Sequence, residues 1–409
     1  MALCKEQREW SANYSLKEHV DYHRHLILFG IEVLFLFFVT VLGLVANVSV
    51  GVAILRVPSL RRNLNNILVI NLIVMDLCSV FGSMPLSFYD LFNEGYLLCF
   101  PLLCRIHGIF ASLSTFGNFS AVVLIAVFRC IIIVGGQKIT MKKQHVMIML
   151  AVGWSCALAM VLPPLIGKDS KSVYTHGTHH CSPSWKSSCG YYSVGIALTY
   201  CITIPTMLIC YGLIVLTIKR SADHIAEFKR KEHMDVQLTG ISQMENNQND
   251  CRIKYNQEEM SSHQDTFQED SFSLNPCSNA QSSDQISTVD VNPQLRQHPL
   301  KSNGGGRVKR KPSRLKLPHY QRYDKKVALS GIALILTTTV CWTPYFIVHA
   351  CKAQKASHGL EVFTMWLAYL NAALDPIVYT LLNRKIHKAV VQQFRFIAAS
   401  AVSACSHFK

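Results

Sequence analysis

Two short motifs near the C-terminal end place prolines and polar or aromatic side chains inside apolar segments. Residues 341–344 are Cys-Trp-Thr-Pro, and residues 375–379 are Asp-Pro-Ile-Val-Tyr. A proline inside a helix removes a backbone hydrogen bond and kinks the helix. An aspartate inside a membrane span is costly, so by default it indicates a functional site. The two motifs therefore predict helices that bend around buried polar groups.

The composition is too apolar for an ordinary soluble domain of this length. Hydrophobic residues make up 50% of the 409 residues and charged residues 16%, and the mean hydropathy is +0.23. Since about 20 apolar residues cross a bilayer, we expect an all-α, seven-transmembrane helix bundle with a short amphipathic eighth helix. The seven apolar segments lie at residues 26–55, 65–92, 102–134, 144–166, 191–218, 325–351 and 361–382.

The same pattern divides the chain into five parts. These are a tail at 1–25, helices one to five at 26–218, a long and largely disordered cytoplasmic loop at 219–323, helices six and seven at 324–382, and the amphipathic helix with a short tail at 383–409. The loop is predicted to be disordered because residues 241–295 are rich in Asn, Gln, Ser, Asp and Glu and contain few aromatic residues. The first residues lack the apolar core of a signal peptide.

The net charge of +15 is concentrated in alternate connections between the spans. Lys and Arg are frequent after spans one, three, five and seven and before span six. This bias predicts a plasma-membrane protein in the lipid bilayer, with its N-terminus outside and its C-terminus in the cytoplasm. It argues against a nucleic-acid partner. Asn13 begins an Asn-Tyr-Ser sequon in the outside tail and is the expected glycosylation site.

Taken together, the motifs resemble the rhodopsin-like (class A) G-protein-coupled receptors across all seven spans. Residues 71–76 (Asn-Leu-Ile-Val-Met-Asp) match the family's second-span motif, and Cys104 precedes Arg129 at the family's spacing. Trp154 stands in the fourth span. The resemblance implies a Cys104–Cys181 disulfide. A second bridge between Cys99 and Cys189 is one of three pairings that four cysteines allow.

The resemblance also implies a polar site midway through the bundle. Asp76, Asn118, Asn371 and Asp375 would surround either a sodium ion or an ion-free water network. The family usually has Ser where Asn118 stands, so both alternatives stay open. No other metal or cofactor is predicted, because no His/Cys cluster has metal-ligand spacing.

Coupling to a heterotrimeric G protein is the function that the resemblance implies, with arrestins and receptor kinases as further candidate partners. Trp342 above Pro344 would be a switch at the pocket floor, and Arg129, Tyr211, Asp324 and Tyr379 would belong to the coupling end. The family's acid before the arginine is Phe128 here. This loss would raise basal activity, unless Asp324 pairs with Arg129 or the packing of Phe128 holds the inactive state. The spacing from Pro205 to Tyr211 also departs from the family's.

The ligand is not specified by these motifs. Ala111 stands where an amine receptor needs Asp, and Tyr369 stands where an opsin needs the retinal-binding lysine. His107 occupies the opsin counterion position. A small neutral or weakly basic ligand fits this set, and a peptide is not excluded. The predicted pocket residues are His107, Ala111, Ser112, Thr115, Trp342, Tyr345, His349, Trp366 and Tyr369.

Three alternatives to a ligand-driven receptor stay open at this point. One is a receptor-like partner that is constitutively active or does not signal, and another is an opsin relative that binds a retinoid non-covalently. A channel or transporter is disfavoured, because inverted repeats and repeated pore charges are missing from the sequence. We expect no enzymatic activity, since neither HExxH nor GxSxG occurs.

Overall fold

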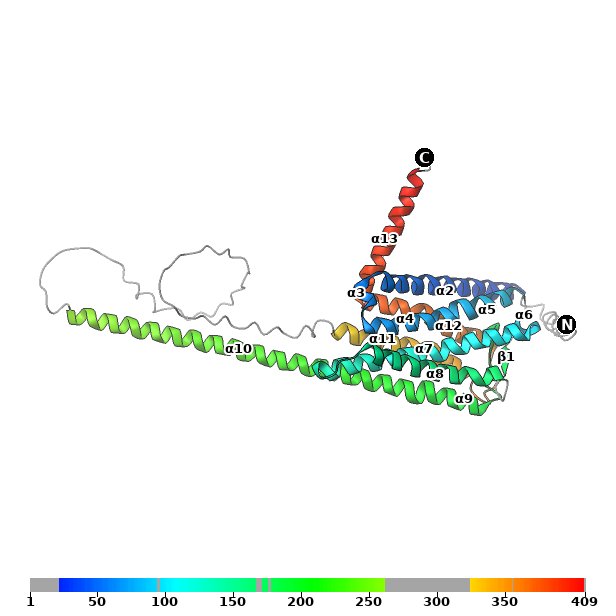
Figure 1. Cartoon of the computed structure of the whole chain (residues 1–409), viewed down its shortest axis with the longest axis horizontal. Helices are drawn as coiled ribbons and strands as arrows, with labels where there is room; N and C mark the ends of the chain where they lie inside the picture. Colours follow the sequence, from blue (N-terminus) through cyan, green and yellow to red (C-terminus); the bar gives the residue numbers. More distant parts are fainter. Residues whose placement is uncertain are drawn as a thin grey trace. The chain divides into compact units, whose positions relative to one another are not determined.

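The computed structural model describes residues 22–93, 96–166, 171–175, 178–261, 324–354 and 356–407. Figure 1 shows a bundle of helices in unit 1 of the chain, residues 1–220 and 319–409. The helical elements are α2 (Tyr22–Arg56), α3 (Pro58–Arg61), α4 (Leu64–Cys78), η1 (Ser79–Ser83), α5 (Met84–Phe92), α6 (Tyr96–Cys99), α7 (Pro101–Gly135), η2 (Gly136–Lys138), α8 (Lys143–Ile166), α9 (Cys189–Ile196), η4 (Ala197–Thr203), α10 (Ile204–Ser261), α11 (Asp324–Val348), α12 (His358–Leu382) and α13 (Arg384–His407).

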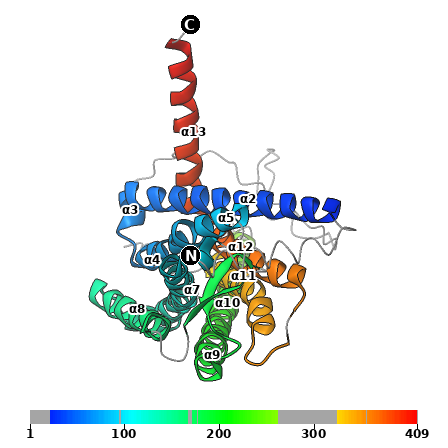
Figure 2. The same ribbon diagram turned by 90° about the vertical axis from the view of Figure 1, so that its right-hand side faces the viewer.

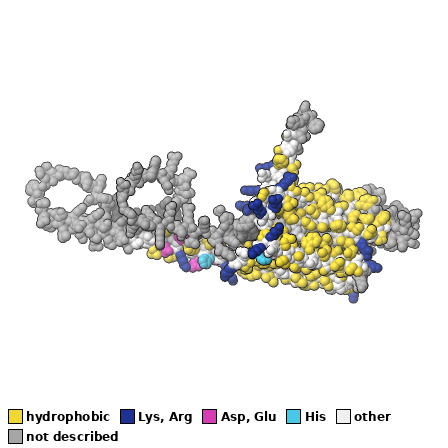
Figure 3. All heavy atoms as spheres, viewed as in Figure 1, with side chains coloured by type: hydrophobic (Ala, Val, Ile, Leu, Met, Phe, Trp, Pro, Cys, Tyr) yellow, Lys and Arg dark blue, Asp and Glu magenta, His cyan; other side chains and the backbone are white. Residues whose placement is uncertain are grey.

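Seven helices in the described part of the chain are long and apolar enough to cross a membrane, which confirms the predicted fold class. Their outward faces carry exposed side chains such as Leu34, Ile148 and Leu208. Figure 3 shows apolar side chains covering the face of the bundle that is turned to the viewer. Such a surface is stable in lipid, where helices satisfy their own backbone hydrogen bonds.

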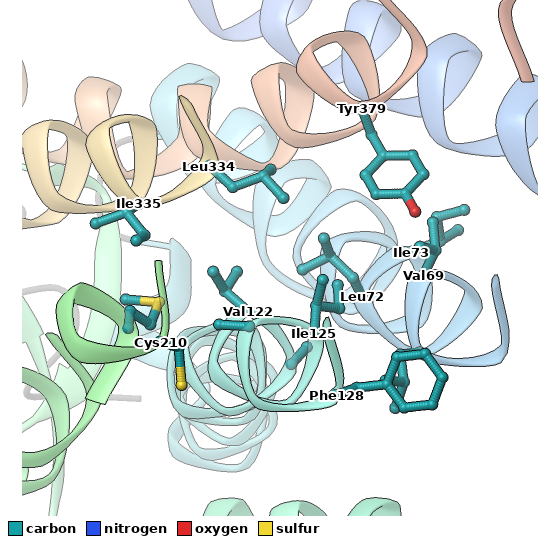
Figure 4. Close-up of a cluster of buried hydrophobic side chains, with 14 of the residues drawn as sticks. Val69, Leu72, Ile73, Val122, Ile125, Phe128, Cys210, Leu334, Ile335 and Tyr379 are labelled. Atoms are coloured by element: carbon teal, nitrogen blue, oxygen red, sulfur yellow. The ribbon is translucent and has the colours of Figure 1, made fainter. Parts of the chain in front are cut away.

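The interior holds two large apolar clusters. One packs Leu72, Ile125 and Leu334 around Tyr379, and Figure 4 shows its members converging from several helices. The other surrounds Trp342 and Phe346. The helices are therefore packed by apolar contacts at two levels along the bundle, and the polar site residues lie within this packing.

Two spans contain short π-helical segments. η1 precedes Pro85, and η4 precedes Pro205. A π-helical turn inserts an extra residue and rotates the residues that follow it. The unusual spacing from Pro205 to Tyr211 follows such a segment, and Tyr211 is buried in the interior.

A β-hairpin lies at one end of the bundle, which we call the hairpin end. Strands β1 (Ser172–Thr175) and β2 (His180–Pro183) are antiparallel, and all four residues of β2 are buried. Figure 2 looks onto this end and shows the strands over α7. A disulfide joins Cys181 to Cys104 at the start of α7, the pairing that the resemblance implies.

The predicted second bridge is wrong. Cys189 pairs with Cys351, and Cys99 is disulfide-bonded to a residue other than Cys189. The Cys189–Cys351 bond joins the start of α9 to the segment after α11. The sequence could not select this pairing, because it depends on which spans are neighbours at the hairpin end.

Two segments are more helical than expected. Residues 219–261 continue α10, although disorder was predicted for 241–295; the rest of that stretch lies outside the described residues. Residues 221–318 form a separate unit, described by itself. The ion pair between Glu227 and Lys231 has the spacing that supports a helix. Similarly, α13 extends to His407, where a short helix and tail were expected.

We predict that Gly331→Ala will destabilise the bundle. A Cβ at position 331 of α11 would overlap the ring and hydroxyl of Tyr211. Tyr211 would have to move, so we expect a loss of roughly 1–3 kcal/mol, as for overpacked cores. The measurement is the thermal unfolding midpoint of the purified protein.

Gly212→Ala is the matched control, because nothing lies within 4 Å of a Cβ there. Both changes give the same gain in helix propensity. Equal unfolding midpoints for the two variants would contradict the overlap.

Candidate functional site

Arg129 lies buried at the end of the bundle opposite the hairpin, with 6% of its surface exposed. Its guanidinium donates to Ser330 Oγ (2.8 Å), Asn65 Oδ1 (3.3 Å) and Tyr211 Oη (3.5 Å). The Tyr379 ring lies 5.4 Å from its Cζ, in cation–π geometry. These partners belong to α4, α10, α11 and α12. Arg129 on α7 therefore connects five helices through neutral side chains.

Phe128, the residue that replaces the family's acid, is 2% exposed. Figure 4 shows its ring extending from α7 toward α4, within the same apolar cluster as Tyr379. The ring contributes packing at this position, where an acid would contribute charge. The predicted pairing of Asp324 with Arg129 stays a prediction, because the Asp324 side chain lies outside those described. Asn13, the expected glycosylation site, also lies outside the described residues.

Midway along the bundle, one amide links two buried carboxylates. Asn118 Nδ2 donates to Asp76 Oδ1 and to Asp375 Oδ2, each at 2.8 Å. Asn371 Nδ2 donates to Asp375 Oδ2 at 3.1 Å. The structure thus brings the four predicted residues together. A second oxygen on each carboxylate, and both amide oxygens, lack a hydrogen-bond donor among the described residues. Such oxygens suit a hard cation or protons.

Toward the hairpin end, a narrow cavity with a free volume of about 20 Å³ has Trp342 in its lining. We call it the main cavity. Six predicted pocket residues line it: Ala111, Ser112, Thr115, Trp342, Tyr345 and Tyr369. Residues that the sequence did not predict also line it, namely Ser79, Ser114, His180, Ser182, Pro183, Trp185, Phe346 and Met365. Several of these come from β2 and the turn after it, whose depth in the bundle has no signal in the sequence.

The other three predicted pocket residues lie elsewhere. His107 is buried beside the cavity, 3.0 Å from Ser87 Oγ. His349 stacks on Tyr345 with ring centroids 4.2 Å apart. Trp366 faces a different cavity. Sequence position alone could not distinguish these three side chains from those that line the main cavity, because neighbouring helix residues point in different directions.

A buried hydrogen-bond cluster joins the main cavity to its surroundings. Tyr369 Oη lies 2.8 Å from both Ser87 Oγ and His180 Nδ1. His107 packs edge-to-face on His180 at 4.5 Å. Burial lowers the pKa of His180 well below its usual range, and His107 and His349 lower it further. His180 is therefore neutral and serves as a hydrogen-bond partner in β2.

These features define a class of protein: a seven-helix membrane receptor with a cavity at one end and a buried arginine at the other. Comparison with known sequences identifies the family. The chain belongs to the 7 transmembrane receptor (rhodopsin family), whose family model matches residues 46–379. It is therefore a class A G-protein-coupled receptor and a multi-pass membrane protein, and its family implies a G-protein partner.

Individual relatives differ in the part that they share with this chain. A blue-sensitive opsin of Carassius auratus is 30% identical over 50% of this chain and 60% of its own length. The G-protein coupled receptor moody of Drosophila pseudoobscura pseudoobscura is 24% identical, over 86% of this chain and 50% of its own. The chain thus spans about half the length of the curated relatives it matches.

A solved structure supports the fold. Squid rhodopsin superposes with a TM-score of 0.60 and 14% identity, covering 91% of this chain and 86% of the rhodopsin chain. At this identity, the match concerns the fold alone.

We predict that acid will destabilise the protein partly through His180. Unfolded, this histidine binds a proton as the pH falls below about 6.5. Folded, it stays neutral because burial lowers its pKa. The unfolded state then binds more protons, so stability is complete above this range and falls below it. Thermal unfolding at about pH 7.5 and pH 5 measures the effect.

His180→Asn should show a smaller decrease in unfolding midpoint on acidification than the wild type. The exposed His145 of α8 supplies the control, His145→Asn, which should behave as the wild type. An unchanged acid response in His180→Asn would exclude His180 as the source.

Proposed function

We propose that this receptor lies in the plasma membrane with the hairpin end outside and transmits a signal to a heterotrimeric G protein at the opposite end. Charge distribution supports the orientation. Figure 3 shows Lys and Arg gathered at one end of the apolar surface. The exposed residues there include Arg56, Arg61, Arg62, Lys142, Lys143, Arg384, Lys385 and Lys388. Such clusters favour the cytoplasmic side.

The arrangement around Arg129 carries the proposal. Its bond to Ser330 holds α7 against α11. An outward movement of α11 would break this bond and free the guanidinium and Tyr211 for other partners. The receptor is then a two-state equilibrium, shifted by whatever binds one state better.

The main cavity favours a small neutral or weakly basic ligand. Its described lining has no carboxylate, lysine or arginine, and most of it is aromatic or carries hydroxyl groups. Opsin relatives do not extend the proposal to a photopigment. Tyr369 has a phenol, which cannot form a Schiff base with an aldehyde.

The polar site at Asn118 would act as the hinge of the same equilibrium. A sodium ion or protons on Asp76 and Asp375 would neutralise the two carboxylates, and both remain part of the proposal. Arrestins and receptor kinases would be further partners at the cytoplasmic end. The alternative is a receptor-like protein that activates no G protein, and measuring basal G-protein activation distinguishes it from a signalling receptor.

We predict that Arg129→Ala will abolish ligand-free G-protein activation. The expected reason is loss of the cation that the open state presents to the G protein. The measurement is basal activation of the main G-protein classes in cells, at matched surface expression. Arg105→Ala, an exposed position at the other end of α7, is the control and should leave coupling unchanged.

Basal coupling that persists in Arg129→Ala would contradict this role for the arginine. Activation of no G protein by the wild type would favour the non-signalling partner.

We also predict that Ser330→Ala will raise basal coupling. It removes the 2.8 Å bond that ties α11 to Arg129. One charge-assisted hydrogen bond contributes about 1.5–3 kcal/mol, so the open population should rise about tenfold or more. The same assay applies, with Ser155→Ala on the exposed face of α8 as the control. Reduced or equal basal coupling would show that this bond does not favour the inactive state.

A further inference from the structure

The disulfide between Cys189 and Cys351 fastens two helical segments together at the hairpin end. Cys189 begins α9 and Cys351 follows α11, and their Cα atoms lie 5.1 Å apart. Beside this bond, the backbone amide of Lys352 donates to the Lys186 carbonyl at 3.3 Å. We call these two links the α9–α11 joint. It connects the segment after β2 to the connection between α11 and α12.

Two tyrosine hydroxyl groups continue the contact along α11. Tyr192 Oη of α9 donates to the Phe346 carbonyl at 3.0 Å. Tyr200 Oη of η4 donates to Thr343 Oγ1 at 3.1 Å. The two acceptors stand on either side of Pro344, where a helix lacks a backbone hydrogen bond and bends. One covalent bond and two hydrogen bonds therefore hold α11 to α9 and η4 at this bend and beyond it.

The opposite end of α11 lies against Arg129. Ser330 accepts the bond from the Arg129 guanidinium, and Gly331 lies against the Tyr211 ring. Both contacts require α11 to stay close to α7 and α10. Because the α9–α11 joint fixes the helix near Pro344, it restricts the positions that the far end of the helix can reach. The joint therefore favours the arrangement in which Ser330 meets Arg129.

The two disulfides differ in exposure. Cys104 is 7% exposed and Cys181 is 0% exposed, so a solute does not reach that bond. Cys189 and Cys351 are half-buried at the end of the bundle. Thiol–disulfide exchange begins when a thiolate reaches a sulfur atom, so access decides which bond reacts. Of these two bonds, Cys189–Cys351 is the one open to a small thiol.

We propose that the Cys189–Cys351 bond is a thiol-exchange site that regulates the receptor. A small thiol outside the cell, such as glutathione, attacks one sulfur atom as a thiolate and forms a mixed disulfide. A second thiol removes the first as a disulfide, and two protons and two electrons pass to Cys189 and Cys351. The loosened joint lets α11 move away from Arg129. The inference rests on the proposed receptor function and names a regulatory site of the same equilibrium.

The first test measures basal G-protein activation in cells before and after glutathione is added to the medium. Basal coupling of the wild type should rise about fivefold or more, the lower end of typical couplings between two sites. The double variant Cys189→Ser/Cys351→Ser should show the raised coupling without glutathione and no further rise with it. Cys201→Ser, which replaces an exposed cysteine of η4, is the matched control and should respond as the wild type.

The double variant also separates this bond from a third one. Cys99 is disulfide-bonded and half-buried, so glutathione reaches it as well. A response to glutathione that persists at full size in the double variant comes from another bond and overturns the proposal.

A second measurement needs no G protein and reports the movement of α11. Cys210 of α10 is 8% exposed and belongs, with Leu334 and Ile335 of α11, to the apolar cluster shown in Figure 4. N-ethylmaleimide should alkylate Cys210 about fivefold faster in the double variant than in the purified wild type, because the open population is larger. Mass spectrometry measures the rate. Cys156, exposed on α8, is the internal control and should react equally in both proteins.

Equal or lower basal coupling in the double variant, together with equal alkylation of Cys210, would overturn the proposal. So would a Cys189–Cys351 bond that stays intact in glutathione, as judged by mass spectrometry of the labelled thiols. Faster alkylation of Cys210 without coupling to any G protein would support the joint and contradict the receptor function alone. The failure of one proposal is thus distinguished from the failure of the other.

Discussion

The Asn118 amide, shared between two carboxylates, is the interaction on which the bundle depends. Asp76 on α4 and Asp375 on α12 are both buried, and this side chain of α7 donates a hydrogen bond to each of them. Two buried carboxylates that lack a cation or proton repel each other and lose their hydration. Their spacing must therefore respond to what neutralises them. Because three helices meet there, a change of charge at this point alters how those helices pack.

Arg129 is subject to the same constraint, because it too is a charged group buried in the bundle, here a cation. Its guanidinium is buried, and the described contacts are hydroxyls, an amide oxygen and the Tyr379 ring. These neutral partners each satisfy one hydrogen bond of the cation or face its charge. Phe128 adds apolar packing to α7 at the place where an acid would add Coulombic attraction. The arrangement around Arg129 thus depends on the joint packing of five helices, and Gly331 leaves the space that the Tyr211 ring occupies beside α11.

The sequence predicted the seven spans well because each needs a long apolar run, a local property. It also predicted that the four residues around Asn118 would meet, through resemblance to a family. It failed where the answer depends on three-dimensional neighbours: Cys189 pairs with Cys351, and Trp366 faces a cavity other than the main one. It failed again in α10, which continues through polar sequence with the Glu227–Lys231 pair on its surface, and in α13, which continues to His407. The depth of β2 is likewise set by the Cys104–Cys181 bond and by burial, which no local pattern reports.

The hairpin end acquires its chemistry from this depth. All of β2 is buried, His180 and Ser182 line the main cavity, and its described lining has no carboxylate, lysine or arginine. Tyr369 stands between α5 and β2 and bonds to both. The positions of Ser87 on α5 and of His180 on β2 are therefore linked, because both bond to one hydroxyl group.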